Sequence, residues 1–109
     1  MTLVRRLFVA QRYSAMLLAP LVLIHLALII FAVRSGLTAE EILSRTRGST
    51  LWFVFYTVFV LTVTVHAPIG LRNLFNEWTR LSPTVVNIIC VALGALMLAT
   101  GLRAVLAVT

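Results

Sequence analysis

A histidine in the second long apolar stretch of the chain is the residue best suited to do chemistry. His66 lies in a run, residues 48–71, that holds no Asp, Glu, Lys or Arg. An imidazole inside a membrane span is costly, so its presence there indicates a function. Because imidazole is a common axial ligand of haem iron, the sequence predicts that His66 is such a ligand.

The neighbours of His66 fit this prediction. Thr62, Gly70 and Asn73 stand at i−4, i+4 and i+7, so they share one stripe of a helix with His66. Gly70 has no side chain and would leave room for a flat macrocycle. Pro68 cannot donate a backbone hydrogen bond and predicts a bend in the helix.

The second histidine, His25, is expected at a different depth. It follows Arg12 by thirteen residues, about 20 Å of helix, whereas His66 precedes Arg72 by six residues, about 9 Å. One haem held by both histidines would need them at similar depth. Either each histidine therefore serves its own haem or only one is a ligand. Arg12 and Arg72 lie about one turn nearer the surface, where haem propionates would point.

The amino-acid composition indicates that this chain is a membrane protein. The 109 residues are 61% hydrophobic and 11% charged, with a mean hydropathy of +1.09, whereas about a quarter of a soluble domain is charged. Three runs without charge contain 21, 24 and 22 residues, and about 20 suffice to span a bilayer as a helix. They are residues 13–33, 48–71 and 81–102.

We therefore predict an all-α membrane protein with three transmembrane helices in an up-down-up bundle and one domain, residues 1–109. The helices are expected at about 13–33, 49–75 and 83–108. A signal peptide is the alternative for the first run, but that run is too long for one and no A-x-A-like site follows it before Arg34.

The segments outside the spans carry most of the charge. Residues 1–12 are basic and amphipathic, and we expect them at the membrane interface. The capping box of Thr38 and Glu41 predicts a short surface helix over about 39–45. Arginines are slightly more numerous on the side of the N-terminus, which predicts a cytoplasmic N-terminus.

The net charge of +6 comes from arginine, since the chain has no lysine. The arginines flank apolar spans, so they indicate lipid headgroups and anionic cofactor groups rather than nucleic acid. The single Cys90 cannot form an internal disulfide and is expected to pack as a small apolar side chain. Hydrolytic triads, phosphate loops and CxxC metal sites have no counterpart in the sequence.

Two segments resemble the cytochrome b membrane-anchor subunits of the succinate dehydrogenase/fumarate reductase family. The first, Gln11-Arg-Tyr-Ser-Ala15, is similar to the family's H-R-x-S-G, with Gln11 and Ala15 as departures. The second, His66-x3-Gly70-x-Arg72-x4-Glu77, is similar to H-x3-G-x-R-H-x3-D, with Asn73 in place of the second histidine and one extra residue before the acid.

The resemblance implies a haem b-binding anchor subunit of the inner membrane that passes electrons between an iron–sulfur subunit and membrane quinone. A flavoprotein and a second small anchor supplying the other haem ligand would complete the complex. It also implies His66 as axial ligand, with His25 as a possible ligand of a second haem. Haem contacts would come from Thr62, Gly70, Arg72 and Arg12, and quinone contacts from Ser14 and Arg12.

Two other functions stay open on the sequence alone. One is a haem-free structural anchor, in which the histidines only form hydrogen bonds between helices. The other is a small proton-handling or transport subunit, in which His25 and His66 relay protons. The sequence does not determine whether the complex oxidises succinate or reduces fumarate.

Overall fold

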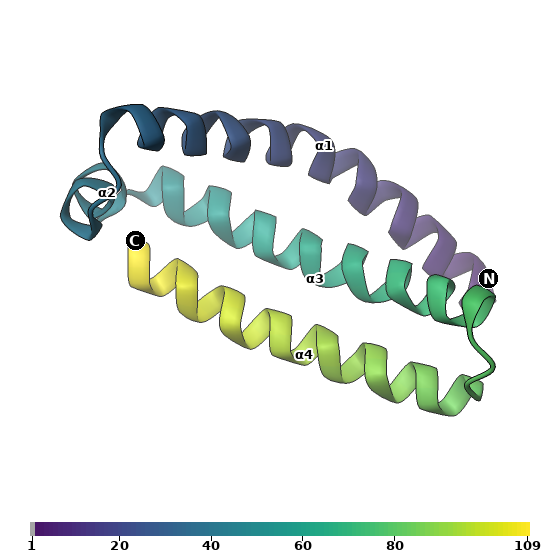
Figure 1. The fold of residues 1–109 in the computed structure, drawn as a ribbon. Coiled ribbons are helices and arrows are strands. Elements are labelled where there is room, and N and C mark those ends of the chain that lie inside the picture. The colour runs from purple at the N-terminus through teal and green to yellow at the C-terminus, as the bar shows by residue number, and fades with distance from the viewer. Residues whose placement is uncertain (1) are drawn as a thin grey trace.

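The computed structural model describes residues 2–109 and forms them into four helices joined by short connections. Helices α1 (Leu3–Ser35), α3 (Thr50–Trp78) and α4 (Pro83–Val108) are long and apolar enough to cross a membrane. They alternate in direction along a body of 47 × 23 × 23 Å (Figure 1). The short α2 (Ala39–Thr46) lies across one end. The predicted three-helix membrane architecture is confirmed.

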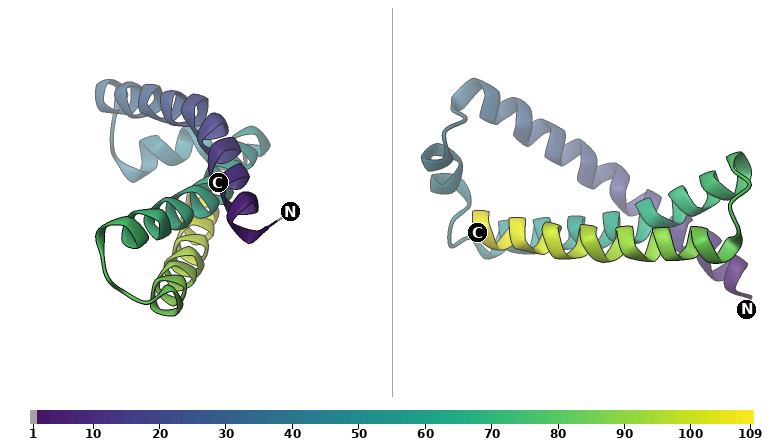
Figure 2. Two further views of the ribbon diagram at one scale, coloured as in Figure 1. Left: turned by 90° about the vertical axis from the view of Figure 1, so that its right-hand side faces the viewer. Right: turned by 60° about the horizontal axis from the view of Figure 1, so that its bottom comes forward.

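Helix α3 forms the middle of the bundle. It packs against α1 on one side and against α4 on the other. The C-terminal ends of α1 and α4 lie apart from each other in the right-hand view of Figure 2. Few side chains are buried, and large apolar residues such as Leu51, Val91 and Leu106 are more than 70% exposed. An apolar exterior of this kind suits a lipid environment, where helix association depends on close packing rather than on hydrophobic burial.

The first helix begins earlier than predicted. Residues 3–12 do not form a separate interfacial segment but are continuous with the membrane span, because Thr2 caps the helix and accepts a hydrogen bond from Arg5 N at 3.2 Å. The sequence between Leu3 and Pro20 holds neither glycine nor proline, so nothing ends the helix there. Pro20 lies inside α1 without breaking it.

The other boundaries lie close to the predicted ones. Helix α3 continues to Trp78, three residues past the expected end, and Thr79 N closes it by donating to Phe75 O at 3.0 Å. Trp78 is 80% exposed, as expected of an aromatic side chain at a membrane interface. Helix α4 has the predicted bounds and begins with Pro83 in its first turn. Cys90 is buried within it, as predicted.

The capping box predicted before α2 is present. Glu41 N donates to Thr38 Oγ1 at 3.2 Å, and Thr38 N donates to Glu41 Oε2 at 3.1 Å. These hydrogen bonds from Thr38 lower the pKa of Glu41 below its ordinary value of 4.5, and the nearby Arg45 contributes least to this shift. The stabilisation by the Glu41 carboxylate is therefore complete above pH 4.5 and is lost as the pH falls through the lowered pKa.

Replacing Thr38 with alanine should loosen α2 without disturbing the membrane helices. Loss of an N-cap of this kind costs about 1 kcal/mol, so amide hydrogen exchange within Ala39–Thr46 should be about fivefold faster. Ser44→Ala is the matched control, because its hydroxyl is exposed and bonds only to Glu41 O. Equal exchange in the Thr38 variant and the wild type would contradict this role of the cap.

Helix α2 is also tied to the end of α4. Thr46 Oγ1 donates to Val108 O, and Gly48 N donates to Thr109 O at 2.9 Å. Gly48 has a φ of +74°, a conformation that glycine adopts without strain. The connection between α1 and α3 is therefore fixed over one end of the bundle.

Candidate functional site

The structure joins His66 to the first helix through a buried serine. The side chain of Ser14, on α1, is 7% exposed and its Oγ lies 3.3 Å from His66 Nδ1 on α3. The same hydroxyl donates to Gln11 O, one turn earlier, at 3.0 Å. Two residues that are far apart in the sequence thus form one polar contact between membrane helices.

This contact uses one of the two imidazole nitrogens of His66, Nδ1. A hydroxyl has one proton, and the proton of Ser14 is directed to Gln11 O. With that proton on Gln11 O, the serine oxygen can accept from His66 Nδ1–H in the tautomer that is protonated at Nδ1. Within residues 2–109, no hydrogen bond is made to His66 Nε2. A ring nitrogen with a free lone pair, opposite an N–H held by a neighbour, is the usual arrangement of a metal-bound histidine.

Gln11 belongs to this cluster, although the sequence interpretation used it only as part of a motif. A Cβ atom at Gly70 would lie 3.1 Å from Gln11 Nε2, so the amide of Gln11 occupies the space that was predicted to admit a macrocycle. Gln11 Oε1 is buried and has no hydrogen-bond partner in residues 2–109. The signal was present in the spacing, because Gln11 precedes Ser14 by three residues on the same helical face.

The predicted stripe on α3 is confirmed in part. Thr62 is buried, and its hydroxyl donates to Val58 O at 2.7 Å. Of the other members of the stripe, His66 and Gly70 are half-buried, whereas Asn73 is exposed. Thr62 therefore contributes its methyl group and shape to this face, since its only proton is used within the helix.

The two arginines predicted at the haem propionates lie on other faces of their helices than His66 and Ser14. Arg72 Nε donates to Asn87 Oδ1 on α4 at 3.2 Å. The physical reason is helical geometry, because six residues at about 100° each place Arg72 about 120° around α3 from His66. Arg12 is exposed on α1, about 200° around that helix from Ser14.

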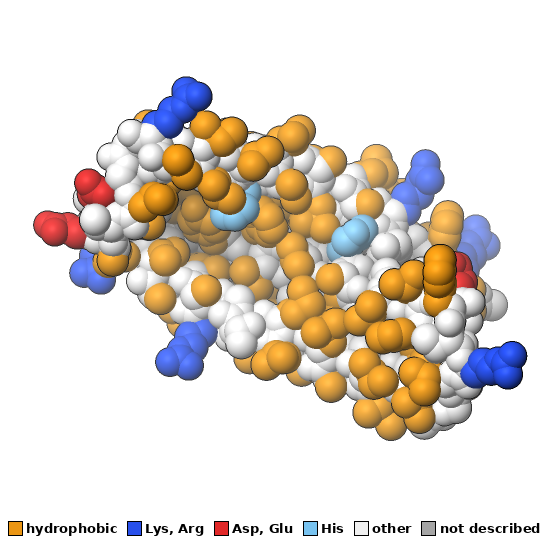
Figure 3. All heavy atoms as spheres, in the orientation of Figure 1, with side chains coloured by type: hydrophobic (Ala, Val, Ile, Leu, Met, Phe, Trp, Pro, Cys, Tyr) orange, Lys and Arg blue, Asp and Glu red, His pale blue; other side chains and the backbone are white. Residues whose placement is uncertain are grey.

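His25 forms a separate site toward α2. Its ring packs edge-on against Tyr56 and Phe59, with centroid distances of 6.2 and 5.2 Å. Tyr56 precedes His66 by ten residues, about 15 Å along α3, so the predicted difference in depth is confirmed. His25 Nδ1 is buried without a hydrogen-bond partner in the described chain. Both histidines reach the face shown in Figure 3.

No group of three or more His, Cys, Asp or Glu side chains that could hold a metal ion is found in residues 2–109. His66 can nevertheless serve a metal already held in a macrocycle, which needs only axial ligands from protein. His66 Nε2 has no hydrogen-bond partner in residues 2–109, so the ring has a nitrogen that could ligate such a metal.

Comparison with known proteins shows which family the chain belongs to. No curated protein and no solved structure shows significant similarity to it. The family model described as the succinate dehydrogenase/fumarate reductase transmembrane subunit matches residues 5–104, which include all three membrane helices in whole or in large part. Through this match, the chain belongs to the family of succinate dehydrogenase/fumarate reductase transmembrane subunits.

Proposed function

We propose that this chain is the haem b-binding anchor of a succinate:quinone oxidoreductase and passes electrons between an iron–sulfur subunit and membrane quinone. The observation that carries the proposal is the contact between Ser14 Oγ and His66 Nδ1, which leaves Nε2 free. A histidine that served only to join two helices would gain nothing from a free second nitrogen inside the membrane.

Each residue of the cluster has a role in this proposal. His66 Nε2 would hold the haem iron, and Ser14 would fix the tautomer and orientation of the ring. Gln11 offers its unpaired Oε1 as a polar contact beside Gly70. When bound, haem b supplies one-electron chemistry. A second ligand would have to come from another membrane chain, because His25 lies at another depth.

The two ends of the bundle differ in their proposed partners. Arg12 and Arg72 lie at the end of the bundle nearer His66, opposite α2, and we assign that end to the cytoplasmic side and to the iron–sulfur subunit. Electrons would then enter close to the haem, and a flavoprotein would complete the soluble part. Ser14 is already bonded to Gln11 and His66, so we place it at the haem rather than at quinone.

Deleting the chain from the native host tests this function. Membranes without it should lose succinate-dependent reduction of a short-chain quinone, whereas a water-soluble dye should still be reduced by soluble flavoprotein and iron–sulfur protein. A tagged copy of the chain should retain both proteins on purification. Quinone reduction at the wild-type rate in the deletion strain would overturn the proposal.

Replacing Ser14 with alanine should weaken haem binding about 10- to 100-fold, because the hydrogen-bonded partner of a metal ligand commonly contributes that much. Loss of the acceptor also makes the imidazole a weaker donor, so the haem reduction potential should rise. Haem content and a redox titration of the purified complex measure both effects. Ser14→Thr keeps a hydroxyl and should retain most of the binding. An unchanged potential in the alanine variant would contradict the positioning role.

A further inference from the structure

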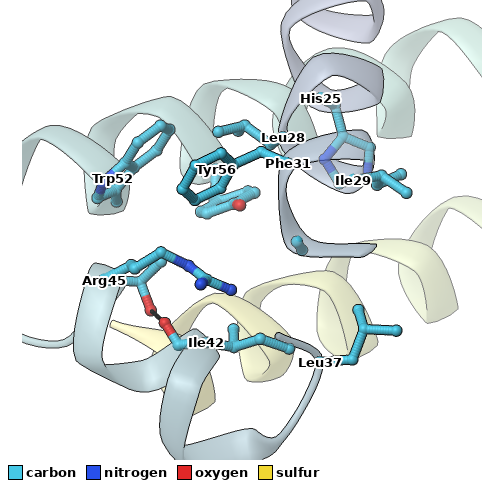
Figure 4. A pocket seen from close by; sticks show the side chains of 11 residues that line it. His25, Leu28, Ile29, Phe31, Leu37, Ile42, Arg45, Trp52 and Tyr56 are labelled. Carbon is cyan, nitrogen blue, oxygen red and sulfur yellow. Dashed lines mark hydrogen bonds between the residues drawn. The ribbon is translucent and has the colours of Figure 1, made fainter. Parts of the chain in front are cut away.

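A hollow with mostly apolar walls lies at the α2 end of the bundle, apart from the His66 cluster. Two adjoining cavities of about 300 and 370 Å³ share His25, Ile42, Thr46 and Tyr56 as lining residues. Figure 4 shows the first cavity between the end of α1, α2 and the start of α3. The hollow opens on the lateral face of the molecule, where Figure 3 shows apolar side chains around one histidine.

The hollow spans about one leaflet of a bilayer. At its outer end, Arg45 Nη2 donates to Gly36 O just beyond α1, and at its inner end lies His25. Gly36 follows His25 by eleven positions, which corresponds to about 16 Å of helix. Half of a hydrocarbon core of about 30 Å is about 15 Å. The hollow therefore reaches from the headgroup level to the middle of the membrane.

A cation without a strong acidic partner stands at the outer end. The guanidinium of Arg45 contacts the carbonyl of Gly36 and lies 5.3 Å from the centre of the Phe31 ring, and neither group is charged. Glu41, one turn before Arg45 on α2, uses its carboxylate to cap Thr38 N, and its interaction with Arg45 is the weakest contribution to the lowered pKa of Glu41. Arg45 has five N–H donors, so several remain for an anion.

The hollow is held in shape by the connection that covers it. Arg45 ties α2 to the end of α1, and Thr46 ties it to Val108 at the end of α4. A site preformed in this way requires little ordering when a flexible chain enters it.

We propose that this hollow binds one anionic phospholipid, with its headgroup on Arg45 and an acyl chain extending inward to His25. The positive charge of Arg45 favours an anionic headgroup. The apolar lining of the hollow, which is about as long as one leaflet, favours an acyl chain. Arginine presents several donors that match phosphate geometry. The inference does not depend on haem at His66, and a haem at His25 would need the same space.

Lipid retention by the purified complex tests the site. The complex is exchanged into nanodiscs that contain equal amounts of phosphatidylglycerol and phosphatidylcholine. It is then released from the nanodiscs, and native mass spectrometry counts the lipids that stay bound. The wild type should retain one phosphatidylglycerol in preference to phosphatidylcholine. Arg45→Gln should lower that preference about tenfold, as expected for a lost charge-assisted contact. Ala32→Phe, which fills the cavity, should lower retention of both lipids.

Arg47→Gln is the matched control, since Arg47 is exposed and does not line either cavity. It should leave the preference within twofold of the wild type. An equal loss in the Arg45 and Arg47 variants would overturn the proposal, because it would indicate general attraction of lipid to basic residues. Loss of a haem absorption band in the Arg45 variant would also overturn it, since the occupant would then be a haem on His25.

Discussion

Replacing His66 with glycine is expected to remove haem b from the assembled complex, and added imidazole is expected to restore it. Glycine deletes the ligand and leaves space for a free imidazole beside Ser14, whose oxygen can accept its N–H. Haem content should fall below about a tenth of the wild-type value, since loss of an axial ligand exceeds the 10- to 100-fold effect of a hydrogen-bonded partner. Absorption spectra of the purified complex provide the measurement.

His25→Gly is the matched control for this substitution. Both histidines are partly exposed and both lie in membrane helices, so the cost of placing glycine in a helix is similar. The control should keep the haem that is assigned to His66. Full haem content in the His66 variant, without imidazole and with all subunits assembled, would rule out His66 as a ligand.

Replacing Gly101 with alanine should separate α3 from α4 locally and lower the thermal stability of the complex. A Cβ atom at Gly101 would lie 2.6 Å from Val60 Cγ1. Valine is β-branched and has one preferred rotamer in a helix, so its methyl group cannot turn aside cheaply. Overpacking of this kind costs about 1 to 3 kcal/mol, against about 1 kcal/mol gained from helix propensity. Thermal unfolding in detergent should therefore show a lower midpoint.

Gly94 gives the control within the same helix. Its added Cβ would lie 3.4 Å from Pro68 Cγ, close to ordinary contact, so Gly94→Ala should be neutral or slightly stabilising. Val60→Ala should remove the clash, and the double variant should couple by about 1 to 2 kcal/mol relative to the single ones. Additive effects of Val60→Ala and Gly101→Ala would contradict a direct contact between these residues.

Much of the fold follows from charge spacing and cap residues. The uncharged runs predicted three membrane helices, and Pro83 and the pair of Thr38 and Glu41 located helix starts correctly. The start of α1 was wrong because arginines were taken to mark an interfacial segment. Charged residues limit how far a helix lies within the membrane, but they do not end the helix. The basic residues therefore extend α1 beyond the membrane span.

The sequence predicted which residues of the candidate site share a face of one helix, but not which residues of different helices meet. Periodicity placed Thr62, His66 and Gly70 on one face, and the structure agrees. The contact of His66 with Ser14 depends on the rotation of α1 against α3, and the sequence contains no simple signal for that rotation. The role of Arg72 at a haem propionate stays a prediction, because counting residues gives its depth along α3 but not its contact with Asn87.

A reduced-minus-oxidised absorption spectrum of the intact wild-type complex, with haem quantified per copy of this chain, tests the central claim most directly. We expect the spectrum of a low-spin b-type haem, one per chain, that appears when succinate is added. That result would follow from axial ligation at His66 by its free Nε2. A fully assembled complex that reduces quinone but shows no haem band would contradict the assignment.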